Sequence, residues 1–552
     1  MTSTAPLDVD TGSRVGGRGG DGPLARISTA LAYALLCAIL TLLFVGLWAA
    51  NTSLLTTGTV LGLTALVCLT GAILFIQDSG EAAMIKGGNN TKSEMAEEVT
   101  IEVLGGGTPS SLKVKVMLIS LALLAAIFCI MAIVFIVGAS REFTTYVPDQ
   151  VLAALSSLTG AIMCLLVARG VCQTKIATVI PLAESTTCWT SCCVCCGLPS
   201  LIICAIIVMW SNTMDVVTMG IVPPGVLIRS DMGDPTLHLF CDGVRNSSLP
   251  TIVFLHGYGG SSRDAHGVRT DPRFTASGLR LCSLDRPGYG WSEGYSPLAH
   301  DKRHFGKIAE ITLDVLIKQE ITGDLVIMFH SLGGYHALAL SAAIARQGFK
   351  DRPKPPRWRV RGMVAVDAMT PSWFAFDKPR PTDQCNVNVE PVSTGWFWPA
   401  VRVVTPTGLP RIVYATGFGG FSDSVSLYGK LADTMLNLNM RRKYTDSRLV
   451  ESARWEMNCG YAIEGQKVLQ EAAAGEFVAL EVLVAIHGLN LTEFGAIASN
   501  STAVKVQRID LTGKFSGSVS QHEALMLSEE ASREWVTPAV LRVARAVVET
   551  GG

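Results

Sequence analysis

One short stretch of the chain combines a candidate nucleophile with the turn that a nucleophile needs. Residues 329–334 read Phe-His-Ser-Leu-Gly-Gly, after an apolar run (325–329) and before a helix-forming run (335–346). Strand, tight turn, serine and helix in this order are typical of a nucleophile elbow, in which strained backbone presents a serine hydroxyl above a sheet. Ser331 is therefore a candidate nucleophile for acyl transfer, and the alternative role is an ordinary helix N-cap.

Phe329 departs from the usual elbow pattern. That pattern is G-x-S-x-G, and Phe329 stands where the first glycine belongs. A small residue there lets the following helix fold back across the strand, so the ring must tilt the helix or turn into a neighbouring gap. The substitution favours a distorted elbow or an inactive homologue as an alternative, although it removes no reacting group.

The elements around this turn predict an α/β fold. From Gly225 onward, short apolar runs alternate with helical patterns, which indicates a mostly parallel sheet covered by helices on both faces. A helical stripe (308–316) precedes the elbow strand, and 538–548 is expected to form the last helix. The expected strands are 226–228, 237–241, 251–255, 280–284, 325–329, 363–366, 482–486 and 504–511.

Three blocks in this region carry a resemblance to a known family. Residues 255–260 read Leu-His-Gly-Tyr-Gly-Gly, residues 285–292 read Asp-Arg-Pro-Gly-Tyr-Gly-Trp-Ser, and the elbow around Ser331 follows. In this order they resemble the α/β-hydrolase family, in its serine esterase and lipase-like branch. The resemblance covers 225–552 and implies an eight-stranded, mostly parallel sheet with helices on both faces and a cap.

The resemblance assigns roles to particular residues. It makes Ser331 the nucleophile and His522, between the last strand and the last helix, the general base. It assigns the two oxyanion-hole N–H groups to Tyr258 and Leu332. The remaining histidines near the motifs are expected to be structural: His256, His330, His336 and His487.

The acid of the triad has more than one candidate. A family acid after the seventh strand would fall at 488–493, where the chain offers Asn490, which carries no charge, and Glu493. Asp367, just past the sixth strand, is the favoured acid, because some α/β-hydrolases take theirs from that position. Glu493 and Asp510 stay open as alternatives.

The long connection after Asp367 predicts a cap over the site at about 370–480. An aromatic cluster, Gly395-Trp-Phe-Trp, lies within it. This cluster is either the core of the cap itself, or an acyl-binding wall or a surface that dips into the bilayer.

The first 220 residues predict a membrane region. A tail (1–26) that we expect to be disordered precedes a transmembrane region at 27–215, and the shortest apolar segment leaves a four-span alternative open. Five segments are long and apolar enough to cross a bilayer: 27–50, 53–76, 116–138, 151–171 and 195–210.

The distribution of charge predicts the orientation of these spans. Lys and Arg gather on the side that would hold the N-terminus, which is therefore expected to be cytosolic. With five spans, the hydrolase-like domain lies in the lumen or outside the cell. Glycosylation sequons at Asn246, Asn490 and Asn500 all follow the last span, which agrees with this placement and predicts a glycoprotein.

The cysteines divide along the same line. A cluster at the cytosolic mouth of the last span favours reversible S-acylation over a zinc site, because no second ligand pair follows at a usual distance, and buried thiols without a role are the alternative. It comprises Cys188, Cys192, Cys193, Cys195 and Cys196. The outer domain holds Cys241, Cys282, Cys385 and Cys459, which could pair in an oxidising compartment.

These patterns favour a membrane-anchored serine hydrolase of carboxylic esters, with a small-molecule or lipid substrate and no metal or cofactor. A net charge of −1 does not suggest a surface for nucleic acid, and no nucleic-acid partner is expected. An inactive hydrolase-like ectodomain with a binding or signalling role is the main alternative. A transporter is disfavoured, because the spans carry no charged residue at mid-membrane.

Overall fold

The computed structural model describes the hydrolase-like region and three helices before it. The described residues are 111–141, 147–177, 198–219, 221–232, 235–244, 248–294, 304–321, 323–346, 358–369, 405, 411, 432–439, 441–453, 455–472, 479–485, 503–509 and 518–551. The expected tail, the spans at 27–50 and 53–76, the three sequons and the clustered cysteines lie outside them.

Three long helices occupy the described part of the predicted membrane region. They are α3 (Ser111–Arg141), α4 (Val147–Ala177) and α6 (Leu198–Met219). Within the described residues, the segment Ile119–Ile136 of α3 is long and apolar enough to cross a membrane. The apolar segments of α4 (Ala153–Leu166) and α6 (Ile202–Met214) are shorter. A single such helix also occurs in the cores of soluble proteins, so the multi-pass topology stays a prediction.

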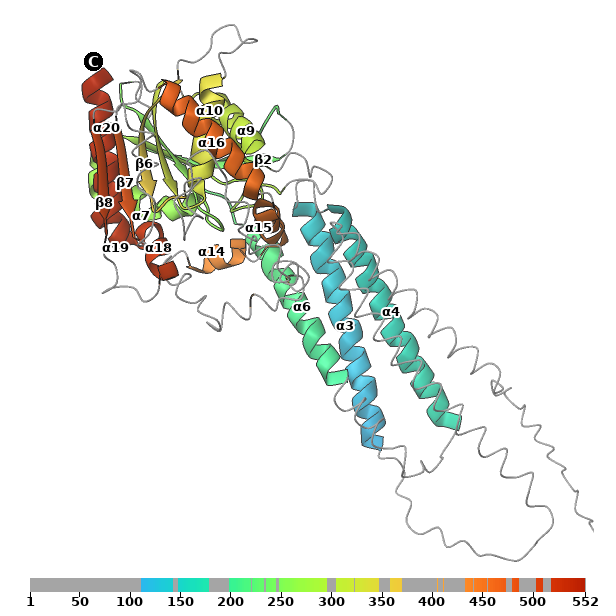
Figure 1. The fold of residues 1–552 in the computed structure, drawn as a ribbon. Helices are drawn as coiled ribbons and strands as arrows, with labels where there is room; N and C mark the ends of the chain where they lie inside the picture. The colour runs from blue at the N-terminus through green and yellow to red at the C-terminus, as the bar shows by residue number, and fades with distance from the viewer. Residues whose placement is uncertain are drawn as a thin grey trace, which may run out of the picture. The chain divides into compact units, whose positions relative to one another are not determined.

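An eight-stranded sheet forms the centre of the hydrolase-like domain (Figure 1). Its order is β1-β2-β4-β3-β5-β6-β7-β8; β2 runs antiparallel to β1 and β4, and every other neighbouring pair is parallel. The mostly parallel sheet expected from the sequence is thus confirmed. The strands are β1 (Val226–Arg229), β2 (Thr236–Asp242), β3 (Thr251–Leu255), β4 (Arg280–Leu284), β5 (Gly323–His330), β6 (Trp358–Val366), β7 (Ala479–Val484) and β8 (Ala503–Arg508).

Helices cover both faces of this sheet. One apolar core joins alternate side chains of the strands to α9 (Phe305–Lys318), α10 (Gly333–Arg346) and α16 (Trp455–Ala472). The other core joins the opposite side chains to the remaining helices. These are the short η2 (Ser262–Ala265), α7 (His266–Arg269), α8 (Pro272–Ala276) and α19 (Glu529–Ala531), together with α18 (Ser518–Leu527), a π-helical turn (Ser532–Val536) and α20 (Thr537–Gly551).

The described part of the expected cap includes three helices, and the last of them belongs to the layer that covers the sheet. Helices α14 (Ala432–Asn439) and α15 (Arg442–Ala453) precede α16, which packs against α10 as part of the covering layer. A Cβ on Gly465 of α16 would lie 2.1 Å from the Leu338 carbonyl oxygen, so glycine permits this close approach. The aromatic cluster at 395–398 lies outside the described residues.

A disulfide joins two neighbouring strands of the sheet. Cys241 on β2 and Cys282 on β4 are register partners and are bonded to each other. Cys459 on α16 is disulfide-bonded as well. Disulfides persist in oxidising compartments, and this agrees with a domain outside the cytosol.

Loss of this disulfide should lower stability. The bond closes a loop across 41 positions of the chain, for which chain entropy gives about 4 kcal/mol of stabilisation. C241S/C282S protein should therefore melt at a lower temperature than the wild type. Alkylation of both cysteines in the unreduced, denatured wild type would contradict the bond.

Candidate active site

The serine of the elbow occupies strained backbone. Ser331 has φ of +51°, a left-handed conformation that is uncommon for residues other than glycine. It directly follows β5, and α10 begins two residues later, so the strand-turn-helix order expected from the sequence is present. The turn is fixed by its own amides: Ser331 N–H donates to the Val366 oxygen, and the Ser331 oxygen accepts from Gly334 and Met369.

Two glycines give α10 room to begin against the sheet. A Cβ on Gly333 would lie 2.3 Å from the Leu255 carbonyl oxygen, and one on Gly334 would lie 2.3 Å from the Met369 oxygen. Both are backbone atoms that cannot move aside. Phe329 is buried in the same apolar core as α10, and Ser331 keeps the left-handed conformation of an elbow. The distortion considered from the sequence is therefore not seen at Ser331.

Asp367 and His522 are in contact. The Asp367 Oδ2 atom lies 2.6 Å from His522 Nδ1, and the Asp367 Oδ1 atom accepts from the Ala485 N–H. Asp367 is buried and has φ of +41°, whereas the His522 side chain is 17% exposed. A buried carboxylate on Nδ1 orients the ring and leaves Nε2 as the atom able to exchange a proton.

His330 links His522 to the elbow. The two rings stack with centroids 4.6 Å apart, and His330 Nε2 lies 3.0 Å from the His522 carbonyl oxygen. Because a carbonyl only accepts, Nε2 carries the proton and donates it. Burial, with a smaller contribution from His522, lowers the pKa of His330 to about 3. His330 is therefore neutral near pH 7, and it positions the segment that carries His522.

The glycine-rich turn after β3 lies against Ser331. A Cβ on Gly257 would lie 2.9 Å from the Ser331 Cβ, so glycine is needed for this approach. Tyr258, the residue predicted to supply an oxyanion N–H, comes next, and Leu332 follows the serine. His256 donates from Nδ1 to the Gly257 oxygen, and its pKa is well below the ordinary value because of burial and then Arg286.

The turn after β4 is held in place by a buried aspartate. Asp285 is buried, and it accepts from the N–H groups of Ser262 and Trp291 and contacts His238 Nδ1 at 2.7 Å. Burial alone would raise the pKa of Asp285, but the charge and hydrogen bond of His238, together with His256 and the Ser262 N–H, outweigh burial and bring the pKa to about 2. Asp285 therefore has a structural role in this turn.

Arg286 and Glu451 form a buried ion pair that the sequence did not reveal. Arg286 Nε lies 2.8 Å from Glu451 Oε1, and Glu451 belongs to α15, 165 positions further along the chain. Arg286 also donates to the carbonyl oxygens of His256 and Gly257. A basic residue two positions after a strand end, with a glutamate in the expected cap, was the available signal.

The other predicted residues lie elsewhere. His336 is buried on α10, 3.1 Å from the Thr312 hydroxyl, which agrees with the structural role expected for it. The alternative acids Glu493 and Asp510, together with Asn490 and His487, fall outside the described residues. No group of three or more potential metal ligands occurs in the described part of the chain.

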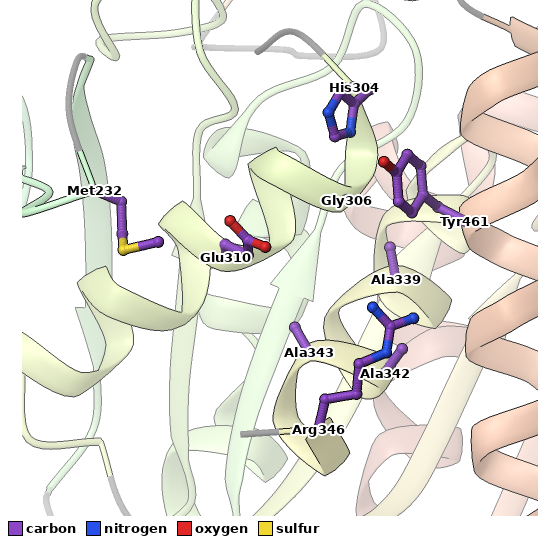
Figure 2. Close-up of a pocket in the computed structure, with 9 residues that line it drawn as sticks. All are labelled: Met232, His304, Gly306, Glu310, Ala339, Ala342, Ala343, Arg346 and Tyr461. Carbon is purple, nitrogen blue, oxygen red and sulfur yellow. The ribbon is translucent and has the colours of Figure 1, made fainter. Parts of the chain in front are cut away.

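A cavity of about 220 Å³ lies among α9, α10 and α16 (Figure 2). Its lining includes the stacked rings of His304 and Tyr461 and three alanines of α10. Neither Ser331 nor any other residue of the predicted triad lines it. It is therefore separate from the elbow.

Comparisons with known proteins agree with this architecture. Residues 252–463 match the model of the alpha/beta hydrolase family. An uncharacterized protein of Schizosaccharomyces pombe is 24% identical over 168 residues, which span 26% of this chain and 28% of the yeast protein. The chain thus covers less than a third of the length of that relative.

The solved structures that the chain resembles include an esterase and an epoxide hydrolase. An esterase from Exiguobacterium antarcticum is 12% identical, with a TM-score of 0.37, over 58% of this chain and 99% of its own. The Cif epoxide hydrolase from Acinetobacter nosocomialis is 15% identical, with a TM-score of 0.38, over 61% of this chain and 96% of its own.

The domain has the α/β-hydrolase fold. The sheet order, the helices on both faces and the elbow at the end of β5 define it, and the family match covers the elbow and both preceding motifs. Fold and family match together support a hydrolase.

The neutral His330 gives a pH test. In the unfolded chain it binds a proton below its ordinary pKa of 6.5, but in the folded protein it does so only near pH 3. Between the two pKa values, the free energy of unfolding therefore falls by roughly 1.4 kcal/mol for each unit by which the pH is lowered. The H330N substitution should remove the part of this pH dependence that comes from His330. His256 and His336 are present in both proteins, so their contributions cancel when the two are compared.

Urea midpoints between pH 6.5 and 4.5 would measure the difference. The wild type should lose stability more steeply than H330N as the pH falls. Parallel pH dependences for the two proteins would contradict a buried, neutral His330.

Proposed function

We propose that this protein is a membrane-anchored serine hydrolase that cleaves carboxylic esters. Ser331 is the nucleophile, His522 the general base and Asp367 the residue that orients His522. The observation that carries the proposal is the 2.6 Å contact between Asp367 and His522, beside a serine in the strained elbow conformation.

The reaction proceeds through an acyl-enzyme. His522 Nε2 takes the proton of the Ser331 hydroxyl while its oxygen attacks the ester carbonyl carbon. The N–H groups of Tyr258 and Leu332 bind the oxyanion that forms. His522 then gives its proton to the leaving alkoxide, and a water molecule releases the acid by the same steps in reverse. No metal or cofactor takes part in these steps.

Several observations support the remaining parts of the proposal. The apolar segment of α3 supports membrane attachment, and the Cys241–Cys282 bond supports a lumenal or extracellular domain. Attachment to a membrane gives access to lipid esters as well as to small soluble ones. Glycosylation at Asn246, Asn490 and Asn500 belongs to the same proposal.

Substitution of the triad tests the mechanism. S331A should lower the hydrolysis of p-nitrophenyl butyrate by at least about 10³-fold, and D367N by about 10³- to 10⁴-fold, because an uncharged amide no longer orients or stabilises the imidazolium. Initial rates of detergent-solubilised protein would measure both effects.

Matched controls come from the same domain. S341A removes a buried hydroxyl from α10 that bonds the Ala337 oxygen, and D314N alters a buried aspartate of α9 that bonds Ser230. Both controls should keep the wild-type rate. Equal hydrolysis rates for wild type and S331A would refute the proposal of a serine hydrolase and favour an inactive ectodomain.

A further inference from the structure

A fully buried arginine lies directly beneath the turn that is proposed to hold the oxyanion. Arg286 is 0% exposed and follows the end of β4. Its Nη1 donates to the His256 oxygen, its Nη2 lies 2.9 Å from the Gly257 oxygen, and its backbone N–H donates to His256 Nε2 at 3.1 Å. Three donors of one residue are thus directed at two adjacent residues of this turn.

The Gly257 carbonyl is the most heavily bonded group of the turn. It accepts from Arg286 Nη2, from His256 Nδ1 at 2.9 Å and from the Gly260 N–H at 3.2 Å. This carbonyl shares a peptide plane with the Tyr258 N–H. In a trans peptide the two groups point in opposite directions, so donors that fix the carbonyl also fix the direction of the N–H.

Glu451 fixes the arginine in turn. Its Oε1 accepts from Arg286 Nε at 2.8 Å, and its Oε2 accepts from Arg286 Nη2 at 3.2 Å and from the Tyr289 hydroxyl at 2.7 Å. Burial and Glu451 raise the pKa of Tyr289, so the phenol keeps the proton that it donates. The carboxylate also balances the guanidinium charge, which leaves Arg286 to orient the turn rather than to add net charge.

One face of α15 contacts the whole turn. Tyr444, Arg448 and Glu451 are spaced by four and then three residues, which places them on one side of the helix. The Tyr444 hydroxyl donates to the Gly259 oxygen at 2.8 Å, and the Arg448 guanidinium lies 4.2 Å from the centroid of the Tyr258 ring. The turn is therefore held by hydrogen bonds from Arg286 and by contacts from α15 of the expected cap.

We propose that Arg286 and Glu451 are positioning residues of the oxyanion hole, which aim the Tyr258 N–H at the reacting carbonyl by fixing the Gly257 oxygen. The inference rests on the proposed function and deepens it. Only a guanidinium has the fork needed here, because it bonds two carbonyl oxygens and a carboxylate at once. Lysine has a single ammonium group in its place.

The test uses full-length protein in detergent, with kcat expressed per serine labelled to completion by a fluorophosphonate. R286K and E451Q should each lower kcat for p-nitrophenyl butyrate by about 10- to 100-fold, less than the loss of a whole oxyanion donor, while KM changes less than about twofold. The Ki of a trifluoromethyl ketone, which forms an oxyanion on Ser331, should rise by the same factor as kcat/KM falls.

Two further variants separate aiming from folding. E481Q removes an equally buried carboxylate from the pair with Arg542 on the far side of the sheet, and it should change neither kcat nor Ki by more than about twofold. R286M/E451M removes both charges together, which leaves no unpaired buried charge, and it should fold and still be slow.

Wild-type kcat and Ki in folded R286K, E451Q or R286M/E451M protein would overturn the inference alone. A fall in kcat with an unchanged ketone Ki would also overturn it, since the residues would then act on another step. A wild type without Ser331-dependent hydrolysis would overturn the proposed function, and this inference with it.

Discussion

The left-handed backbone at Ser331 is the constraint on which the site depends. A residue other than glycine in this conformation costs roughly 1–3 kcal/mol, so the surroundings must over-determine it. They do so through three backbone hydrogen bonds to Val366, Gly334 and Met369. Asp367, at the end of the neighbouring strand, also has a positive φ. Two of the three non-glycine residues with positive φ in the described part of the chain thus lie at adjacent strand ends, where the proposed nucleophile and acid project above the sheet.

Three buried histidines of the domain differ from His522 in their surroundings. Burial lowers the pKa of His256, His330 and His336, so each is neutral near pH 7, and backbone partners fix the tautomer of His256 and His330. His522 differs because it faces solvent in part and has a carboxylate on Nδ1. This division explains how several histidines near one serine can leave a single ring for proton transfer.

Much of the domain could be predicted from the sequence because its signals are local. Apolar runs of strand length mark all eight strands, and the glycine-rich turns mark the ends of β3, β4 and β5, the last of which carries Ser331. The choice between Asp367 and Glu493 was not local, since it depends on which carboxylate the fold brings to His522. The contact favours Asp367, although the triad roles remain a proposal.

What could not be predicted depends on pairs that are distant in the chain. Four cysteines in the outer domain allow three pairings, and it is the strand register that sets Cys241 opposite Cys282. Arg286 and Glu451 are 165 positions apart, and no sequence pattern in α15 indicates that Glu451 pairs with Arg286. The multi-pass membrane region is still a prediction, because one described helix has the required length and apolarity.

The most direct test of the central claim is to map a fluorophosphonate adduct by mass spectrometry. The native, membrane-extracted protein should carry one adduct on the peptide that contains Ser331, and heat-denatured protein should carry none. An unmodified Ser331 in folded protein, or an adduct on a different serine, would contradict the account.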